Sequence, residues 1–331
     1  MNRFASMCCL LACLLVGCQS PGASEATQAS SSTGPYALVL GTAQDAGLPQ
    51  LGCTAACCES ARRDPERRRL VTSLLVVDPE SGGRWLFDAT PDLREQVERA
   101  RGHPPGRSPP GNRPPLFEAV YLTHAHMGHL AGLLQLGQEA YAARGQPVLG
   151  TARMVDFLER DEPWALAVRS GHLLPRALVP GQREPLRGPA GEPTALSVTA
   201  FLVPHRDEVT DTVGYLVEGP ARRLVYLPDI DKWERWERPL EDLLADLDVA
   251  LVDGSFFADG EIPGRSLADI PHPFISETLE RLADQPLDLR RRVVFTHLNH
   301  SNPAADPAGE AARTVHAAGM SIAHEGQRFD L

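Results

Sequence analysis

Short runs of apolar and β-branched residues recur along the chain, and glycine, proline and other turn-forming residues bound them. Runs of this kind are typical of buried β-strands. They lie at residues 36–40, 73–77, 119–122, 198–203, 224–227, 249–252 and 293–295. Apolar positions at helical spacing predict helices at residues 130–143, 154–159, 236–247 and 276–282. The pattern therefore predicts a mixed α/β fold.

The N-terminal residues follow a different pattern. A single charge, at Arg3, precedes an apolar run at residues 10–17. This run is shorter than the roughly 20 apolar residues of a membrane-spanning helix, so it predicts a secretory signal peptide. Residues 18–34 are rich in Ser, Ala, Thr and Gly, which is typical of a flexible tether. We therefore expect a signal peptide at residues 1–17, a tether at 18–34 and the folded domain at 35–331.

Residues 15–18, Leu-Val-Gly-Cys, resemble the lipobox of bacterial lipoproteins. The resemblance implies that the signal is removed and that Cys18 becomes the lipid anchor to a membrane. Gln19 and Ser20 provide no Asp retention signal after the cysteine. The expected location is therefore the cell envelope, on the periplasmic face of the outer membrane if the host is Gram-negative. The alternative is a secreted protein that is cleaved elsewhere.

The charge balance narrows the range of expected partners. The chain has 32 Lys and Arg residues and 43 Asp and Glu residues, which give a net charge of −11. Affinity for nucleic acid comes mainly from Lys and Arg. We therefore expect no nucleic acid partner for this acidic chain.

Three histidines lie within six residues, directly after the predicted strand at 119–122. They are His124, His126 and His129, and neutral imidazole is the commonest protein ligand for zinc or iron. Three further residues of metal-binding type follow later strands, namely His205, Asp229 and His297. A lone histidine at such a place is more often an ordinary polar residue. The joint occurrence of all six residues favours a metal centre.

The segment from His124 to His129 resembles the His-x-His-x-Asp-His signature of the metallo-β-lactamase fold superfamily, with Gly128 in place of the Asp. The resemblance implies an αββα sandwich of two mixed β-sheets flanked by helices. It also implies that the metal ligands are His124, His126, His129, His205, Asp229 and His297.

A closer similarity is to the protein B family of pyrroloquinoline quinone (PQQ) biosynthesis and its relatives, including the phosphonate-pathway cyclic phosphodiesterase. It rests on residues 40–50 and the cysteines that follow, and on residues 203–208, 211–214, 228–233, 252–254 and 296–303. In protein B the histidine signature is usually degraded, whereas here only its Asp is missing. The chain therefore looks like a paralogue of the biosynthetic protein.

The ligand count predicts one or two catalytic metal ions. His124, His126 and His205 give one ion three nitrogen ligands and leave a position for water, which is the open arrangement of a catalytic zinc site. His129 and His297 would hold a second ion, with Asp229 as the bridging carboxylate. Gly128 supplies no carboxylate to the second ion. Either a water takes the place of this ligand in a centre of two ions, or one ion is tightly held and the second is labile. We favour the centre of two ions. We expect Gly128→Asp to raise the affinity for a second zinc, unless the loop requires the conformational freedom of glycine.

Three of the seven cysteines lie beyond the N-terminal segment, namely Cys53, Cys57 and Cys58. An odd, clustered set in an exported protein indicates a reactive thiol or a metal site with a ligand from elsewhere. Relatives in this branch carry a structural zinc that uses a His three residues after the last catalytic His, which is the place of His300. The resemblance thus implies a structural zinc. It leaves open whether Cys57, Cys58 or both bind, and the alternative is a disulfide of Cys53 with one neighbour.

Five residues in the segments shared with the family are candidates for the substrate pocket or for orienting the ligands. They are Asp45, Arg206, Glu208, Asp253 and His272.

A bound zinc lowers the pKa of its water from ~15.7 to ~7, so hydrolysis is the natural reaction of such a centre. We expect a metal-dependent hydrolase that uses zinc-bound hydroxide on a small-molecule ester, lactone, amide or phosphodiester, with catalytic roles for Asp229 and His205. One alternative is an iron-dependent oxygenase like PQQ protein B, because the same ligands suit non-haem iron. Another is a non-catalytic metal-binding lipoprotein of the envelope.

Overall fold

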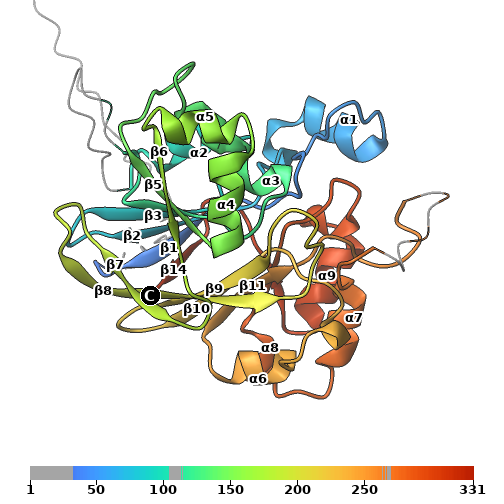
Figure 1. Cartoon of the computed structure of the whole chain (residues 1–331). Coiled ribbons are helices and arrows are strands. Elements are labelled where there is room, and N and C mark those ends of the chain that lie inside the picture. Colours follow the sequence, from blue (N-terminus) through green and yellow to red (C-terminus); the bar gives the residue numbers. More distant parts are fainter. Residues whose placement is uncertain (1–32, 104–112, 114, 263, 265, 267–269) are drawn as a thin grey trace, which may run out of the picture. The chain divides into compact units, whose positions relative to one another are not determined.

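Two mixed β-sheets lie face to face, and helices cover their outer faces (Figure 1). The computed structural model describes residues 33–103, 113, 115–262, 264, 266 and 270–331. The expected signal peptide, the lipid anchor at Cys18 and nearly all of the expected tether lie outside the described residues. The αββα sandwich predicted from the sequence resemblance is confirmed.

The first sheet joins the N-terminal strands to the last strand of the chain. Its order is β14 (Arg328–Asp330), β1 (Tyr36–Gly41), β2 (Ser73–Asp78), β3 (Gly83–Phe87), β4 (Ala119–Tyr121), β5 (Gln146–Gly150) and β6 (Leu173–Ala177). Pairing is antiparallel from β14 to β3 and parallel from β3 to β6.

The second sheet has the same mixture of pairings. Its order is β13 (Ser321–Ile322), β12 (Val293–Thr296), β11 (Val249–Asp253), β10 (Arg223–Leu227), β9 (Thr212–Glu218), β8 (Pro193–Val203) and β7 (Arg183–Arg187). Strands β7 to β10 pair antiparallel, and β10 to β13 pair parallel. In consequence β1, β3 and β4 of the first sheet share one direction, and so do β8, β10, β11 and β12 of the second.

Helices bury both outer faces. The α-helices are α1 (Ala56–Arg63), α2 (Leu93–Ala100), α3 (Met127–Leu130), α4 (Ala152–Arg160), α5 (Trp164–Arg169), α6 (Leu240–Ala245), α7 (Ile275–Arg281), α8 (Leu287–Arg290) and α9 (Glu310–Ala317). Short 3₁₀ helices are η1 (Pro65–Arg67), η2 (Ala131–Leu136), η3 (Trp233–Arg235) and η4 (Pro303–Ala305). Residues of α2 to α5 pack on the first sheet, and residues of α6, α7 and α9 pack on the second.

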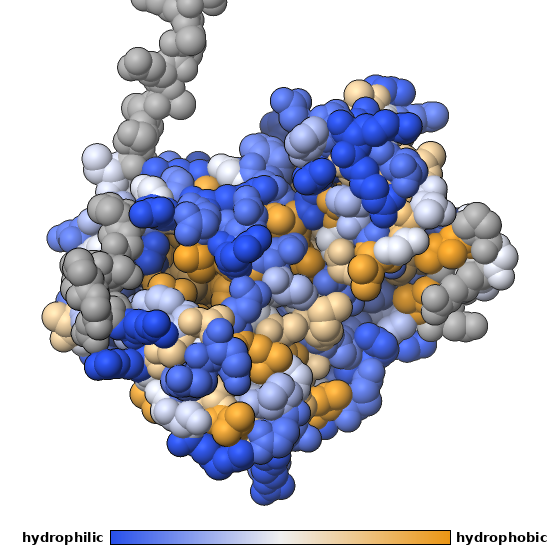
Figure 2. Space-filling view, turned by 90° about the horizontal axis from the view of Figure 1, so that it is seen from above, coloured by the Kyte–Doolittle hydropathy of each residue, from blue (hydrophilic) through white to orange (hydrophobic). Residues whose placement is uncertain are grey.

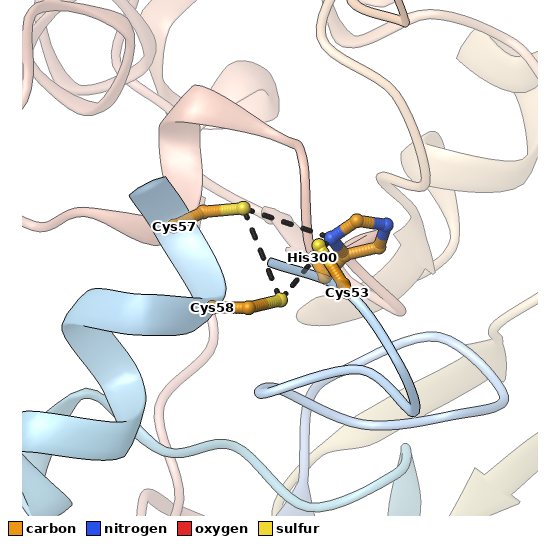
Figure 3. A group of neighbouring side chains, drawn as sticks. All are labelled: Cys53, Cys57, Cys58 and His300. Atoms are coloured by element: carbon orange, nitrogen blue, oxygen red, sulfur yellow. Dashed lines mark hydrogen bonds between the residues drawn. The ribbon is translucent and has the colours of Figure 1, made fainter. Parts of the chain in front are cut away.

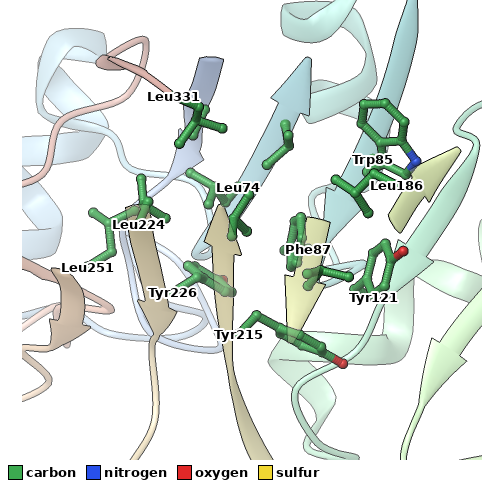
Figure 4. Packing of buried hydrophobic residues seen from close by; sticks show 14 of the residues in the cluster. Leu74, Trp85, Phe87, Tyr121, Leu186, Tyr215, Leu224, Tyr226, Leu251 and Leu331 are labelled. Carbon is green, nitrogen blue, oxygen red and sulfur yellow. The ribbon is translucent and has the colours of Figure 1, made fainter. Parts of the chain in front are cut away.

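The strand sequences explain why both faces of each sheet are covered. In β1, Ala37 and Val39 point into the core between the sheets, whereas Leu38 and Leu40 point outward beneath the helices. Because side chains alternate along a strand, a continuous apolar run needs cover on both sides. Figure 4 shows the core between the sheets, where Phe87 stacks on Tyr121 at a ring distance of 4.9 Å.

Every strand predicted from an apolar run is present, and α4 and α7 confirm the helices predicted at 154–159 and 276–282. The single helix predicted at 130–143 is wrong. The chain there forms α3, η2 and turns, because the Gly132 amide bonds to the carbonyl of Ala89 (2.9 Å) and leaves the helical ladder. The helix predicted at 236–247 is shorter, since α6 begins only after Pro239, which cannot donate within a helix.

The surface is predominantly polar. Figure 2 shows one face, on which hydrophilic side chains predominate and hydrophobic ones lie in scattered groups. Single exposed apolar residues are ordinary on protein surfaces. Within the described part of the chain, no helix is both long and apolar enough to span a membrane.

Candidate metal centre

The six predicted ligands come together at one edge of the sandwich, where loops follow strands of the same direction. The carboxyl ends of such strands meet at one edge, which is a common place for a binding site in α/β proteins. The segments that follow β4, β8, β10 and β12 carry the predicted ligand side chains, with His129 on α3; they are His124, His126, His129, His205, Asp229 and His297.

Three histidines form the first group, which we call the first metal position: His124, His126 and His205. One ring nitrogen of each lies within 4.8 Å of the others. His124 Nε2 is 2.7 Å from His126 Nδ1, and His205 is buried against both rings. The group leaves room for a further ligand, as a catalytic ion requires.

His129, His297 and Asp229 form the second group, which we call the second metal position. The Asp229 Oδ2 atom lies 2.8 Å from His129 Nε2 and 3.2 Å from His297 Nε2. Its other oxygen, Oδ1, lies 3.7 Å from His205 Nε2 of the first position. Asp229 therefore faces both positions, as expected for a bridging carboxylate.

Several donor atoms of the two positions have no hydrogen-bond partner outside the centre among the described residues. They include His205 Nδ1 and Nε2, His129 Nε2, His297 Nε2 and Asp229 Oδ2, all of them buried. Buried polar atoms without partners are rare in folded proteins because desolvation is costly. A divalent ion bound by the imidazole nitrogens and the carboxylate would compensate the cost of their desolvation. The residues therefore fit a metal centre.

At the second metal position, the opposite ring nitrogens of both histidines have hydrogen-bond partners, which fix the rings. His129 Nδ1 lies 2.8 Å from Asp88 Oδ2, and His297 Nδ1 lies 2.9 Å from the Ser255 hydroxyl. Partners of this kind orient ligand imidazoles and set their tautomers. Asp88, which orients a ligand but is not one, was not predicted from the sequence, although it follows β3 as the predicted ligands follow their strands.

The charges of the centre depend strongly on one another. Burial lowers the pKa of His205 to about 4, so its imidazole is neutral at pH 7 and free to bind metal. Burial also lowers the pKa of His129, but the carboxylates of Asp88 and Asp229 outweigh it and raise that pKa well above 6.5. Without a metal ion, the protonated imidazole of His129 thus supplies the positive charge that compensates the carboxylate of Asp229.

The predicted pocket residues fall into two places. His272 and Asp253 are buried beside the centre, with His272 Nδ1 2.7 Å from Asp253 Oδ2 and 3.5 Å from Asp229 Oδ1. Arg206 and Glu208 lie on the exposed rim. Their side chains approach His126 to 3.3 Å and 3.5 Å respectively, and they pair with each other at 3.7 Å.

Asp45 lies on the second metal position. Its Oδ1 atom is 3.7 Å from His129 Nε2 and 4.0 Å from His297 Nε2. It also limits the space at Gly128, where an added Cβ would lie 2.1 Å from Asp45 Oδ1 and 2.7 Å from Asp45 Cα. This crowding argues against the expectation that Gly128→Asp improves the second position. Left-handed geometry does not explain the glycine either, because Gly128 has no positive φ.

A second cluster brings together the four residues of the expected structural site (Figure 3). His300 Nδ1 lies 3.4 Å from Cys58 Sγ and 3.6 Å from Cys57 Sγ, and the two sulfurs are 3.9 Å apart. In a tetrahedral zinc site, sulfurs about 2.3 Å from the ion are about 3.8 Å apart, and sulfur to nitrogen is about 3.5 Å. Both adjacent cysteines thus face one point together with Cys53.

All three cysteines of this cluster are free thiols, so the disulfide alternative is not formed. Backbone amides approach two of the sulfurs, Gln50 N to Cys58 at 3.3 Å and Ala55 N to Cys53 at 3.4 Å. Burial raises the pKa of Cys58 to about 12, so this thiol ionises only if a cation compensates its charge.

The two clusters share one segment of chain. His297 and His300 are separated by Leu298 and Asn299 on the loop after β12. Leu298 exchanges backbone hydrogen bonds with the loop after β1, from its amide to the Thr42 carbonyl (2.8 Å) and from the Gln44 amide to its carbonyl (2.9 Å). The loop that carries Asp45 is thereby fixed to the segment that carries both histidines.

Comparisons with known proteins agree with this fold. Residues 83–298 match the family described as Beta-lactamase superfamily domain. The chain is 30% identical to coenzyme PQQ synthesis protein B of Methylobacterium radiotolerans over 89% of its own length and 99% of that protein. The protein of the same name from Methylobacterium nodulans is also 30% identical, with the same coverage.

Solved structures show the same fold. Zinc-bound PqqB from Methylobacterium extorquens has a TM-score of 0.73 at 24% identity, covering 89% of this chain and all of that one. A diphosphatase of the PhnP family has a TM-score of 0.62 at 22% identity, covering 90% and 98%.

Proposed function

Because the chain belongs to the β-lactamase superfamily, we propose that it is a metal-dependent hydrolase of small molecules. The observation that carries the proposal is the convergence of buried donor atoms that have no hydrogen-bond partner outside the centre, His205 Nε2, His129 Nε2 and Asp229 Oδ2 among them. Structural packing alone gives no reason to bury such atoms together.

Each part of the site has a distinct role in this proposal. Zinc bound at the first position would supply a water with a pKa of about 7, and hence a nucleophile at neutral pH. The Asp229 carboxylate orients what binds between the two positions, because its oxygens face both. Asp253 holds a proton on His272 Nδ1, since the carboxylate outweighs burial and raises the pKa of that imidazole. His272 is therefore suited to protonate a leaving group.

Arg206 and Glu208 pair with each other at the rim, so this pair alone favours neither a positively nor a negatively charged substrate. A panel of chromogenic phosphodiesters, lactones, esters and β-lactams therefore tests the proposal. We expect zinc in the purified protein and hydrolysis of at least one class, lost on chelation of the catalytic metal and restored by zinc. Iron in place of zinc, with oxygen consumption and no hydrolysis, would instead establish the oxygenase alternative.

A function like that of PQQ synthesis protein B is the second candidate, and the oxygenase alternative belongs to it. The relatives at 30% identity are named coenzyme PQQ synthesis protein B, and the similarity covers 99% of their length. Histidine and carboxylate ligands with an open position suit non-haem iron as well as zinc. A protein that binds metal but shows neither hydrolysis nor oxygen consumption would be the non-catalytic lipoprotein.

We also propose that Cys18 is lipidated and that it anchors the domain to a membrane of the cell envelope. The proposal rests on the Leu-Val-Gly-Cys sequence at residues 15–18 and the Ser-rich segment behind it. We expect Cys18→Ser to be released from membranes or to stay unprocessed. Membrane fractionation and gel mobility of the full chain check this, with Cys13→Ser as the matched control. Identical behaviour of Cys18→Ser and the original protein would contradict the anchor.

A further inference from the structure

We propose that the Asp45 carboxylate is a ligand of the second metal position and that Gly128 leaves the space for it. The inference rests on the proposed metal centre but not on the reaction that the centre catalyses. It replaces the expected incomplete second position by one with four protein ligands.

The distances support direct ligation. Two ligand atoms, each about 2.1 Å from a tetrahedral ion, are about 3.4 Å apart. Asp45 Oδ1 lies 3.7 Å and 4.0 Å from the Nε2 atoms of His129 and His297. Asp229 Oδ2 lies 2.8 Å and 3.2 Å from the same two nitrogens. The two carboxylates thus approach the histidine pair at spacings on either side of the ideal value.

Asp45 Oδ1 also shares the environment of the other donors. This atom is buried and has no hydrogen-bond partner among the described residues. The Asp45 side chain as a whole is 35% exposed. The atom that faces the histidines is therefore the one shielded from water. A carboxylate that only bound substrate would gain nothing from burying this oxygen against two ring nitrogens that lack partners.

The charges agree with a divalent ion. Two neutral imidazoles and the shared carboxylate of Asp229 alone would leave a bound divalent ion with at least one net positive charge in a buried place. The carboxylate of Asp45 lowers this excess, which matters because buried charge is costly unless it is compensated.

Gly128 supplies independent evidence, because it lies beside this carboxylate. The space into which its Cβ would project is already filled by Asp45, with Oδ1 at 2.1 Å and Cγ at 3.0 Å from the Cβ position. A side chain at residue 128 and the observed place of Asp45 therefore exclude each other. The glycine is explained by the carboxylate that reaches across from the loop after β1.

The backbone holds Asp45 in place. Gln44 donates to the carbonyl of Leu298 (2.9 Å), next to His297, and the Gly47 amide closes a turn onto the Gln44 carbonyl (2.8 Å). The loop that carries Asp45 is therefore hydrogen-bonded to the segment that carries His297. These bonds position Asp45 before a metal ion binds.

A zinc titration with Asp45→Asn tests the assignment. The substitution keeps the shape of the side chain but removes its charge. Proteins are freed of catalytic metal with a chelator mild enough to leave the structural zinc, and zinc binding is followed by competition with a chromophoric chelator. We expect the original protein to bind two further zinc ions. In Asp45→Asn the weaker of these should lose affinity by about 100-fold or more, while the tighter one changes little.

Asp92→Asn is the matched control. Asp92 is also half-buried, and its Oδ2 accepts from the Val71 amide at 2.8 Å, which an asparagine oxygen can replace. Both zinc affinities should stay as in the original protein.

Gly128→Ala provides a second variant that removes no donor. Its methyl group should displace Asp45 and weaken the same zinc. Combined with Asp45→Asn it should add little, because both changes act on one ligand. An unchanged second affinity in Asp45→Asn, effects that multiply in the double variant, or a single zinc in the original protein would each overturn the assignment. Hydrolysis by a protein with one catalytic zinc would still leave the proposed function standing.

Discussion

His205→Ala is expected to lower hydrolysis by at least about 10³-fold, because loss of the ion and its activated water removes several kcal/mol of transition-state stabilisation. The catalytic zinc content should fall by one equivalent. The fold should remain, since His205 makes no hydrogen bond that the alanine would lose. Zinc analysis, kinetics and thermal melting of the metal-free protein check these three expectations, and His126→Ala should behave alike.

His316→Ala is the control for this experiment, because His316 is exposed on α9 and is not among the residues of the two metal clusters. It should keep full zinc content and full activity. Hydrolysis by His205→Ala within tenfold of the original rate would show that the first metal position is not where the reaction occurs.

Cys58→Ala is expected to lower the melting temperature by about 10 °C or more, because a structural zinc contributes its binding free energy to folding. His300→Ala should have the same effect, since it removes a ligand from the same ion. Cys58 is fully buried, and its sulfur lies between His300, Cys57 and the Gln50 amide. Differential scanning calorimetry of each protein as purified measures the change.

A strong chelator separates loss of zinc from loss of packing. It should lower the melting temperature of the original protein to near that of Cys58→Ala and leave the variant almost unchanged. If His205→Ala and Cys58→Ala lost the same number of degrees, the division into a catalytic and a structural site would fail.

The strands and most ligands were predictable because their signals are local. A buried strand of a sandwich needs an apolar run, and each run that ends in a histidine or aspartate marks a possible ligand, as before His124 and His205. Asp88 follows β3 in the same way, but the apolar run before it has only three residues, Trp85 to Phe87, because β3 begins with Gly83 and Arg84. The structural cluster was predictable from the cysteines and from the place of His300.

Other features depend on contacts between distant segments and leave no local signal. The helix predicted at 130–143 is interrupted because Gly132 bonds to Ala89, far away in sequence. The meaning of Gly128 was likewise invisible, because the carboxylate that fills its space belongs to Asp45. Spacing in the sequence describes which residues one loop presents, but not which residue of another loop lies opposite.

We expect the shared segment between His297 and His300 to couple the two clusters thermodynamically. An ion on the three cysteines and His300 would restrain the loop after β12, and through Leu298 also the loop that carries Asp45. Ordering these loops in advance reduces the entropy lost when the second catalytic ion binds, and so raises the affinity for that ion. By linkage, the second catalytic ion raises the affinity for the structural ion by the same factor. Zinc supply would then set activity in steps, with the structural ion loaded first and the centre completed only when zinc is plentiful.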